Sequence, residues 1–233
     1  MGNQGANNLI FSNTKTKTMK IFKLNAEPRT ELGKKASAKL REENLIPVVL
    51  NGGEVVELPY NGTLLAGQKV VELGARNKGI ITTDLTVKAE DVRKLVYSPD
   101  VFEIDLTFDG VTRKAILKDL QFQPVKDTIL HMDLLEVNDK KPVVVEVPVK
   151  LEGHAAGVKA GGKLSLSMKK LKVKAIYSEI PERVVINVDA LELGKTIQVG
   201  DLHYDGFEVV NAKNAVVCAV QLTRAARGAQ AKA

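Results

Sequence analysis

The sequence has no tryptophan, a single cysteine, and only 4% aromatic residues. A hydrophobic core must therefore be built from Val, Ile, Leu and Ala, and abundant β-branched side chains favour β-strands. The single cysteine, Cys218, excludes an intramolecular disulfide, which fits a reducing compartment such as the cytoplasm. Because Cys218 lies in an apolar run, we expect a buried thiol rather than a nucleophile.

Long hydrophobic runs are also missing. No segment approaches the roughly 20 apolar residues of a transmembrane helix, and residues 1–18 are polar, without the hydrophobic region of a signal peptide. We therefore predict no membrane partner. We expect residues 1–18 to be a disordered extension, or to reflect an upstream start in a protein that naturally begins at Met19.

Catalytic and metal-binding patterns are lacking as well. His131, His154 and His203 are far apart and have no cysteine at metal-ligand spacing. Residues 157–163 have the G-x-x-x-x-G-K spacing of a phosphate-binding loop, but Leu164 stands where Ser or Thr should bind magnesium. We expect a glycine-rich turn there, and predict no enzyme, metal, cofactor or small-molecule substrate. A phosphate-transferring enzyme built on this loop is the alternative from another functional class.

The chain does contain enough apolar residues for a core, 44% of 233 residues, and it carries a net charge of +6. A basic surplus favours polyanionic partners such as nucleic acid or an anionic membrane surface. The length accommodates one large or two small domains.

The first half of the chain alternates between strand and helix patterns. A helix is predicted over residues 34–44, because Leu32, Ala36 and Leu40 recur every four residues on one face that can pack on a core. A two-residue Asp109-Gly110 turn joins alternating strands into a hairpin. The further predictions are strands over residues 21–24, 46–50, 101–108, 111–117 and 129–137, a helix over 88–95, and hairpins or a loop over 57–81.

A polar break at residues 138–142 is our predicted domain boundary. Beyond it nearly every apolar segment has the spacing of strands in an all-β domain. We therefore predict a mainly β (α+β) protein. Its predicted parts are an extension (1–18), a first domain (19–137), a C-terminal all-β domain (138–223) and a flexible basic tail (224–233), with strands over 143–151, 164–176, 183–188, 196–199 and 215–222.

Three charged or polar patterns are candidates for binding. Residues 29–41 hold five cations against the single anion Glu31, which fits either phosphate binding or an ordinary solvated face. Lys170, Lys172 and Lys174 share one strand face, which we interpret as protection of an exposed sheet edge. His131 and Asp133 also share a strand face, as a surface pair or as donor and acceptor for a polar ligand.

These segments resemble a known family in order along the chain. Residues 25–29, 33–41, 46–47 and 52–53 are similar to the opening of large-subunit ribosomal protein twenty-five. Residues 118–125 and 129–133 resemble its second signature. Residues 146–149, 152–153, 157–162 and 180–182 resemble the second domain of the long form, which includes the Ctc general stress proteins. The resemblance spans most of residues 20–222.

The resemblance implies a small N-terminal β-barrel with flanking helices that binds 5S ribosomal RNA. The expected partners are 5S rRNA, the large ribosomal subunit and neighbouring ribosomal proteins, on cytoplasmic ribosomes. By motif position, cations would meet the RNA backbone and polar side chains would meet hydroxyls and base edges. The cations are Arg29, Lys34, Lys35, Lys39 and Arg41, and the polar residues are Asn51, Gln121, His131 and Asp133.

Three positions depart from the family pattern. Asn51 stands where Tyr is usual, Ala38 where Arg is frequent, and Gln123 where His is frequent. Each change removes a ring or a charge from the expected RNA-binding face. The alternative is therefore a loosely ribosome-associated general stress protein with a partly eroded face.

Overall fold

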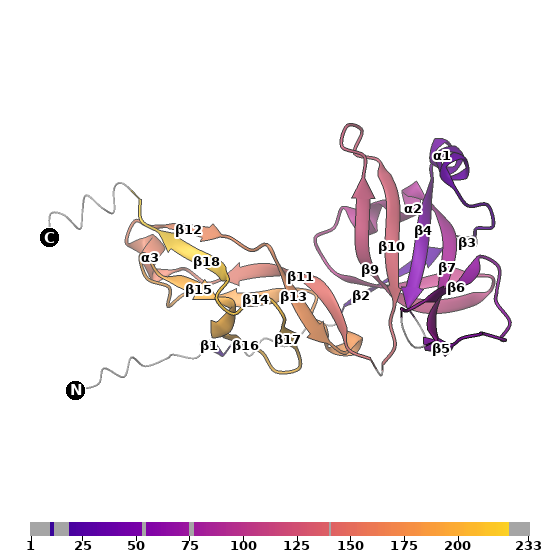
Figure 1. Cartoon of the computed structure of the whole chain (residues 1–233). Helices are drawn as coiled ribbons and strands as arrows, with labels where there is room; N and C mark the ends of the chain where they lie inside the picture. The colour runs from indigo at the N-terminus through magenta and orange to yellow at the C-terminus, as the bar shows by residue number, and fades with distance from the viewer. Residues whose placement is uncertain (1–9, 12–18, 53–54, 75–76, 140, 224–233) are drawn as a thin grey trace. The chain divides into compact units, whose positions relative to one another are not determined.

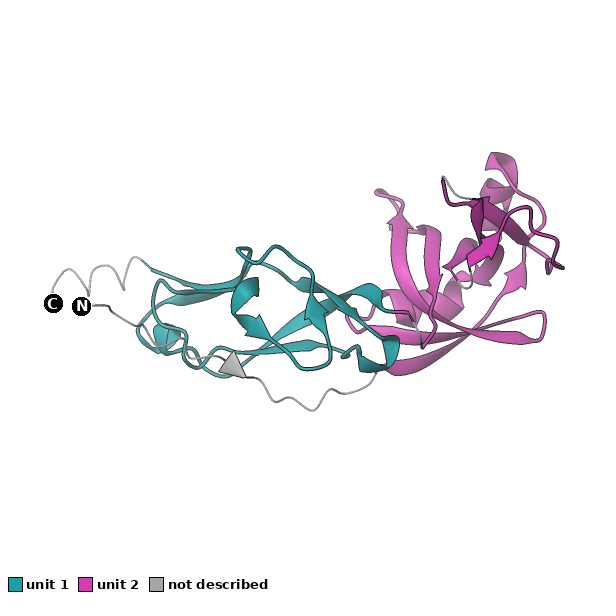
Figure 2. Cartoon of the chain, turned by 60° about the horizontal axis from the view of Figure 1, so that its bottom comes forward, with its two compact units in different colours: residues 1–18, 142–233 teal, residues 19–141 magenta. Residues whose placement is uncertain are grey.

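The computed structural model describes residues 10–11, 19–52, 55–74, 77–139 and 141–223. The chain divides into two compact units, residues 19–141 and residues 142–233 together with 1–18 (Figures 1 and 2). Within the predicted N-terminal extension, β1 (Ile10–Phe11) pairs in parallel with β16 (Leu202–His203). The rest of the extension and the predicted tail, residues 224–233, lie outside the described residues.

The unit of residues 19–141 is one nine-stranded sheet in the order β2-β8-β9-β10-β4-β7-β3, with β5 and β6 also paired to β7. Only Ala26 separates β2, which pairs with β8, from β3, which pairs with β7. The two ends of the sheet are therefore linked by one short segment, which curls it into the predicted small barrel with flanking helices. The elements are β2 (Lys20–Asn25), β3 (Glu27–Pro28), α1 (Lys34–Glu42), β4 (Leu45–Gly52), β5 (Val55–Glu57), β6 (Gln68–Glu72), β7 (Lys78–Lys88), α2 (Ala89–Val96), β8 (Phe102–Phe108), β9 (Val111–Phe122) and β10 (Ile129–Glu136).

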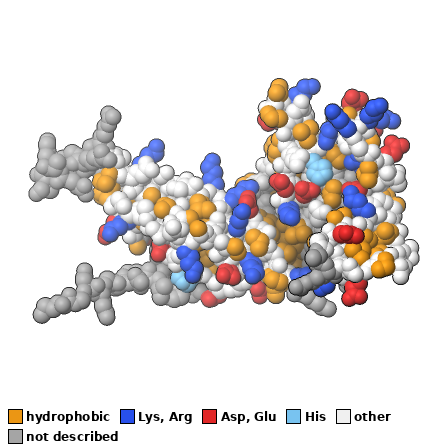
Figure 3. Space-filling model, viewed as in Figure 1, with side chains coloured by type: hydrophobic (Ala, Val, Ile, Leu, Met, Phe, Trp, Pro, Cys, Tyr) orange, Lys and Arg blue, Asp and Glu red, His pale blue; other side chains and the backbone are white. Residues whose placement is uncertain are grey.

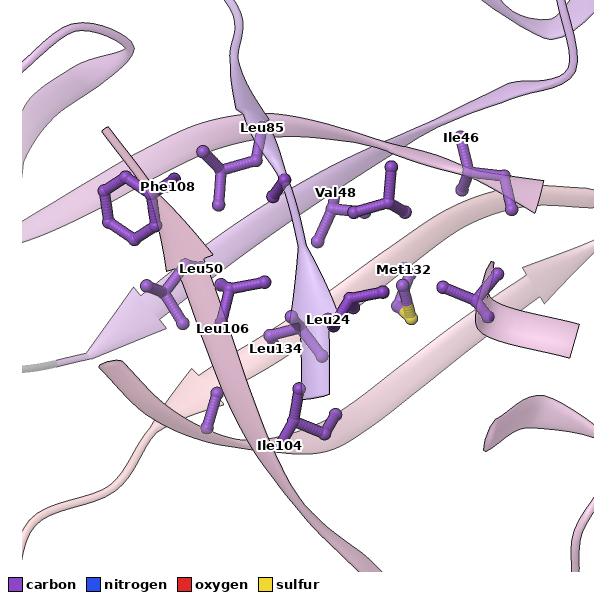
Figure 4. Close-up of a cluster of buried hydrophobic side chains, with 14 of the residues drawn as sticks. Leu24, Ile46, Val48, Leu50, Leu85, Ile104, Leu106, Phe108, Met132 and Leu134 are labelled. Carbon is purple, nitrogen blue, oxygen red and sulfur yellow. The ribbon is translucent and has the colours of Figure 1, made fainter. Parts of the chain in front are cut away.

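The barrel core consists mainly of alternate residues from β4, β7, β8 and β10 (Figure 4). On β10, Met132 and Leu134 are completely buried and pack among aliphatic side chains of β2, β4, β7 and β8. Helix α2 adds Val92 and Leu95 to the same cluster. Phe108 is the one aromatic side chain in the buried cluster, so the core is aliphatic as the composition predicts.

Several local predictions in this unit are confirmed. Asp109 (φ 49°) and Gly110 (φ 74°) both have positive φ, as a two-residue type I′ hairpin turn requires. The stretch 57–81 forms hairpin strands, because β5 and β6 both pair antiparallel with β7. The strand predicted over residues 46–50 is longer than expected, since Asn51 and Gly52 continue β4.

The expectation that the first helix packs an apolar edge on the core is wrong. Helix α1 has no buried residue, and Leu32 precedes it with 56% of its surface exposed. Ala36 and Leu40 of this helix are only half-buried, and hydrogen bonds from Arg29 and Arg41 fix its two ends.

Besides the β1–β16 pair, the second unit contains two sheets, in the orders β14-β11-β13-β17 and β12-β18-β15. The single strand predicted over residues 164–176 is two strands in different sheets, since the chain turns between Leu166 and Lys170. Cys218 is buried, and burial raises the pKa of its thiol. The remaining elements are β11 (Val143–Glu152), α3 (Ala156–Lys159), β12 (Lys163–Leu166), β13 (Lys170–Ala175), β14 (Val184–Asn187), β15 (Thr196–Gln198), β17 (Glu208–Val209) and β18 (Val216–Gln221), with 3₁₀ turns at Tyr177–Glu179 and Val199–Asp201.

This topology bears on the predictions for two lysine-containing segments. Strand β17 covers the outer flank of β13 from Lys172 to Lys174, so Lys172 and Lys174 do not lie on an open sheet edge as we interpreted them. Lys163 begins a strand rather than a helix, so residues 157–163 do not form a phosphate-binding loop. A Cβ atom on Gly157 would lie 2.6 Å from the backbone nitrogen of Leu193, so close packing explains this glycine.

Replacement of Met132 by Ala tests the barrel core. We expect the free energy of unfolding to fall by about 2–5 kcal/mol, because the site is fully enclosed and cannot collapse around the cavity. The matched control is His131→Ala on the other side of β10, for which we expect a loss below about 1 kcal/mol. Urea denaturation followed by circular dichroism measures both, and equal losses would contradict this assignment of the two faces.

Candidate nucleic-acid interface

The predicted polar residues lie on the outer face of the barrel sheet. Because Met132 and Leu134 face the core, the alternation of β10 directs His131 and Asp133 to the opposite side. In the register of the sheet, His131 stands opposite Gln121 of β9. On the other flank, Leu135 stands beside Asn51 of β4. All four predicted polar residues therefore share one face across three adjacent strands.

This outer face is accessible to a ligand. His131 Nδ1 lies 3.4 Å from Asp133 Oδ1, and the two side chains are 26% and 30% exposed. Gln121 is exposed, and Asn51 is half-buried. The face therefore presents an imidazole, a carboxylate and two amides, which together donate and accept hydrogen bonds.

Helix α1 brings the predicted lysines to the margin of the same face. It leads through two residues into β4, and its last turn contacts the start of β10. Lys34, Lys35 and Lys39 are exposed, and within the described part of the chain none of them has an ion pair. Figure 3 shows Lys and Arg side chains gathered over α1, with a histidine and acidic side chains on the adjoining surface.

Arg41 has a structural contact that the sequence did not indicate. Its Nε and Nη2 atoms donate hydrogen bonds of 3.1 and 2.9 Å to the backbone carbonyl of Leu130, the residue before His131. A guanidinium has five N–H donors, so Arg41 keeps further N–H groups that can bind an external anion. Arg41 therefore joins the C-terminal end of α1 to the strand that carries the histidine.

Arg29 fixes the other end of the helix. Its Nε donates to the carbonyl of Glu31 at 2.7 Å, and its Nη2 donates to Ser37 Oγ at 2.9 Å. The Ser37 hydroxyl in turn donates to the carbonyl of Gly33. The two predicted arginines thus hold α1 in place, while the three lysines remain unpaired within the described residues.

The sequence alone did not identify Asp119 as a residue of this face, and Gln123 has a role that the family pattern did not suggest. Asp119 stands opposite Asp133 in the register of β9 and β10, and the two-residue spacing from Gln121 could have identified it. Gln123, at a departure from the family pattern, closes the β9–β10 loop, since its Oε1 accepts a hydrogen bond from Thr128 Oγ1 at 2.9 Å. Gln123 therefore has a role within the loop.

The net positive charge of the chain does not come from residues 19–141. Residues 19–141 contain 19 Lys and Arg against 19 Asp and Glu, and residues 142–223 contain 10 against 9. Most of the net charge of +6 comes from two lysines in residues 1–18 and three cations in residues 224–233, with no acidic residue in either segment. Any attraction of the barrel for RNA must therefore come from a local arrangement of charges.

Other kinds of site have little support in the described residues. They contain no group of three His, Cys, Asp or Glu side chains that could hold a metal ion. None of their helices combines the length and apolarity needed to cross a membrane. An open pocket of about 470 Å³ lies beside β6, with mostly apolar walls, and is lined by Leu58, Pro59, Tyr60, Leu64, Val70, Glu72 and Asn77.

Comparison with known proteins gives similar sequences over almost the whole chain. A protein of Parabacteroides distasonis is 56% identical over 219 residues, which cover 92% of this chain and 100% of the relative. Proteins of Porphyromonas gingivalis and Phocaeicola vulgatus are 54% and 50% identical, each over 92% of this chain and 99% of the relative. All three are named large ribosomal subunit protein bL25.

Two family models match, one in each unit. The model described as the ribosomal L25p family matches residues 24–68 and 70–134. The model described as ribosomal protein TL5, C-terminal domain, matches residues 142–224. These are families of structural ribosomal proteins and not of enzymes. The chain belongs to the ribosomal L25p family, in the form that carries a TL5-type C-terminal domain.

Proposed function

We propose that this protein is a structural component of the bacterial large ribosomal subunit and binds 5S rRNA through residues 19–141. The relatives are named as proteins of that subunit, which supports a location on cytoplasmic ribosomes. The observation that carries the proposal is the convergence of the α1 lysines and the His131–Asp133 pair on one open face, joined through Arg41.

The shape of this face suits an RNA minor groove. The minor groove of an RNA helix is wide and shallow and exposes 2′-hydroxyls and base edges, whereas its major groove is too narrow for side chains. An outward sheet surface can lie along such a groove. Gln121, His131 and Asn51 would then donate or accept hydrogen bonds at hydroxyls and base edges.

The two carboxylates restrict how the RNA can lie. Asp119 and Asp133 stand in one row across β9 and β10, and phosphates are repelled by such a row. Carboxylates only accept hydrogen bonds when ionised, so they suit 2′-hydroxyl or base amino donors. The phosphates would therefore run along α1, while the groove floor lies over the strands.

A double substitution, Lys34→Gln with Lys39→Gln, tests the role of α1. We expect weaker binding to 5S rRNA and a decrease of about two in the magnitude of the slope of log K against log salt concentration, because two phosphate contacts are lost. The matched control, Lys88→Gln with Lys94→Gln, removes the same charge from exposed positions around α2. Filter-binding titrations would contradict the assignment if both double variants behaved alike.

Replacement of His131 by Ala tests the polar part of the face. We expect binding to weaken by about 1–3 kcal/mol with an unchanged salt slope, since a contact to a hydroxyl or a base is lost rather than a phosphate contact. Gel shifts with purified 5S rRNA and with transfer RNA measure the affinity and the preference. If the unsubstituted protein shows no preference for 5S rRNA, the proposal is overturned. That result would favour the alternative, a loosely ribosome-associated stress protein with an eroded face.

A further inference from the structure

The three lysines of β13 form an ordered row on the second unit. Leu171, Val173 and Ala175 face the core of that unit, at 0%, 0% and 6% exposure. The alternating lysines at 170, 172 and 174 therefore point outward, and all three are exposed. Successive members lie two residues apart along a strand, or about 6.6 Å, which is comparable to the separation of neighbouring phosphates in a nucleic-acid strand.

Protection of a sheet edge does not account for Lys172 and Lys174. The backbone of Lys172 is already paired, because its N–H donates to Asn211 Oδ1 at 2.7 Å and its carbonyl accepts from Val210 N–H at 2.8 Å. The outer flank of β13 is therefore covered from Lys172 to Lys174, and charged side chains are not needed there to prevent further pairing.

Two acidic side chains lie beside the row. Glu146 stands opposite Lys172, and Glu208 stands opposite Lys174. Even so, within the described residues neither glutamate forms an ion pair with the row, and Lys170 has none either. The three ammonium groups are therefore available to an external anion.

Positive charge in this unit is concentrated near the row. Of the ten cations in residues 142–223, four lie within residues 169–174, and the remaining six stand against nine acidic residues. The unit is thus slightly acidic outside β13. A ligand attracted by charge would be directed to this strand rather than to the unit as a whole.

We propose that Lys170, Lys172 and Lys174 form a second RNA-binding surface that contacts the phosphate backbone of an RNA duplex. Evenly spaced point charges match a repeating phosphate backbone, for which lysine is a common ligand. An acidic protein surface has no such regular spacing. The contact is independent of base sequence and strongly dependent on salt, and it lies on a different unit from the proposed 5S rRNA interface.

The test uses the full-length protein with Lys170, Lys172 and Lys174 all replaced by Gln. The matched control replaces Lys163, Lys195 and Lys213, which are equally exposed positions of the same unit. Fluorescence anisotropy with a short labelled RNA duplex of arbitrary sequence is measured over a range of salt concentrations. We expect the row variant to lose about two to three from the magnitude of the salt slope and at least about tenfold in affinity, while the control changes little.

The alternative outcomes are distinct. Equal losses in the two triple variants would mean unspecific charge attraction and would overturn the proposal, as would an unchanged row variant. A row variant that loses binding to poly-glutamate but not to the duplex would assign the surface to an acidic protein partner. The preference for 5S rRNA over transfer RNA should persist in the row variant, so failure of this proposal and failure of the 5S rRNA proposal are separable.

Discussion

The interface on the barrel depends on the burial of alternate residues in β10. Met132 and Leu134 are held in the core by side chains from five other strands, and this fixes His131 and Asp133 on the outside. The same burial sets the register with β9 and β4, which aligns Gln121 with the histidine. A slip of one residue would exchange the two faces and bury the histidine. The core therefore positions the polar face, although no core residue would touch RNA.

The lysines of α1 and the arginines at its two ends have different roles. Its lysines are exposed, whereas Arg29 and Arg41 make hydrogen bonds that tie its two ends to the rest of the barrel. The planar, multidentate guanidinium suits this fixed geometry better than an ammonium group. A helix with no buried residue can therefore keep a defined place beside His131, and its lysines remain available for phosphates.

Local patterns in the sequence predicted most of the helices and strands. The features that they did not predict depend on contacts between residues far apart in the sequence. Strand alternation placed His131 and Asp133 together, and Asp109-Gly110 identified its hairpin. The hydrogen bonds from Arg41 to Leu130 link residues 89 positions apart, so no local period could indicate them. The division of residues 164–176 into β12 and β13, and the interior place of β13, likewise follow from pairing with strands remote in sequence. The basic pI suggested a nucleic-acid partner, yet most of that surplus lies in the terminal segments.

The most direct test of the central claim is covalent footprinting of the full-length protein with and without 5S rRNA. Acetic anhydride labels lysines and diethylpyrocarbonate labels histidines, and mass spectrometry measures each site. One RNA helix across α1 and β10 should protect Lys34, Lys39 and His131 together, at the same RNA concentration, while exposed His203 keeps its reactivity. Protection of the lysines with a fully reactive His131 would contradict the account, because the helix and the strand would then not share one ligand.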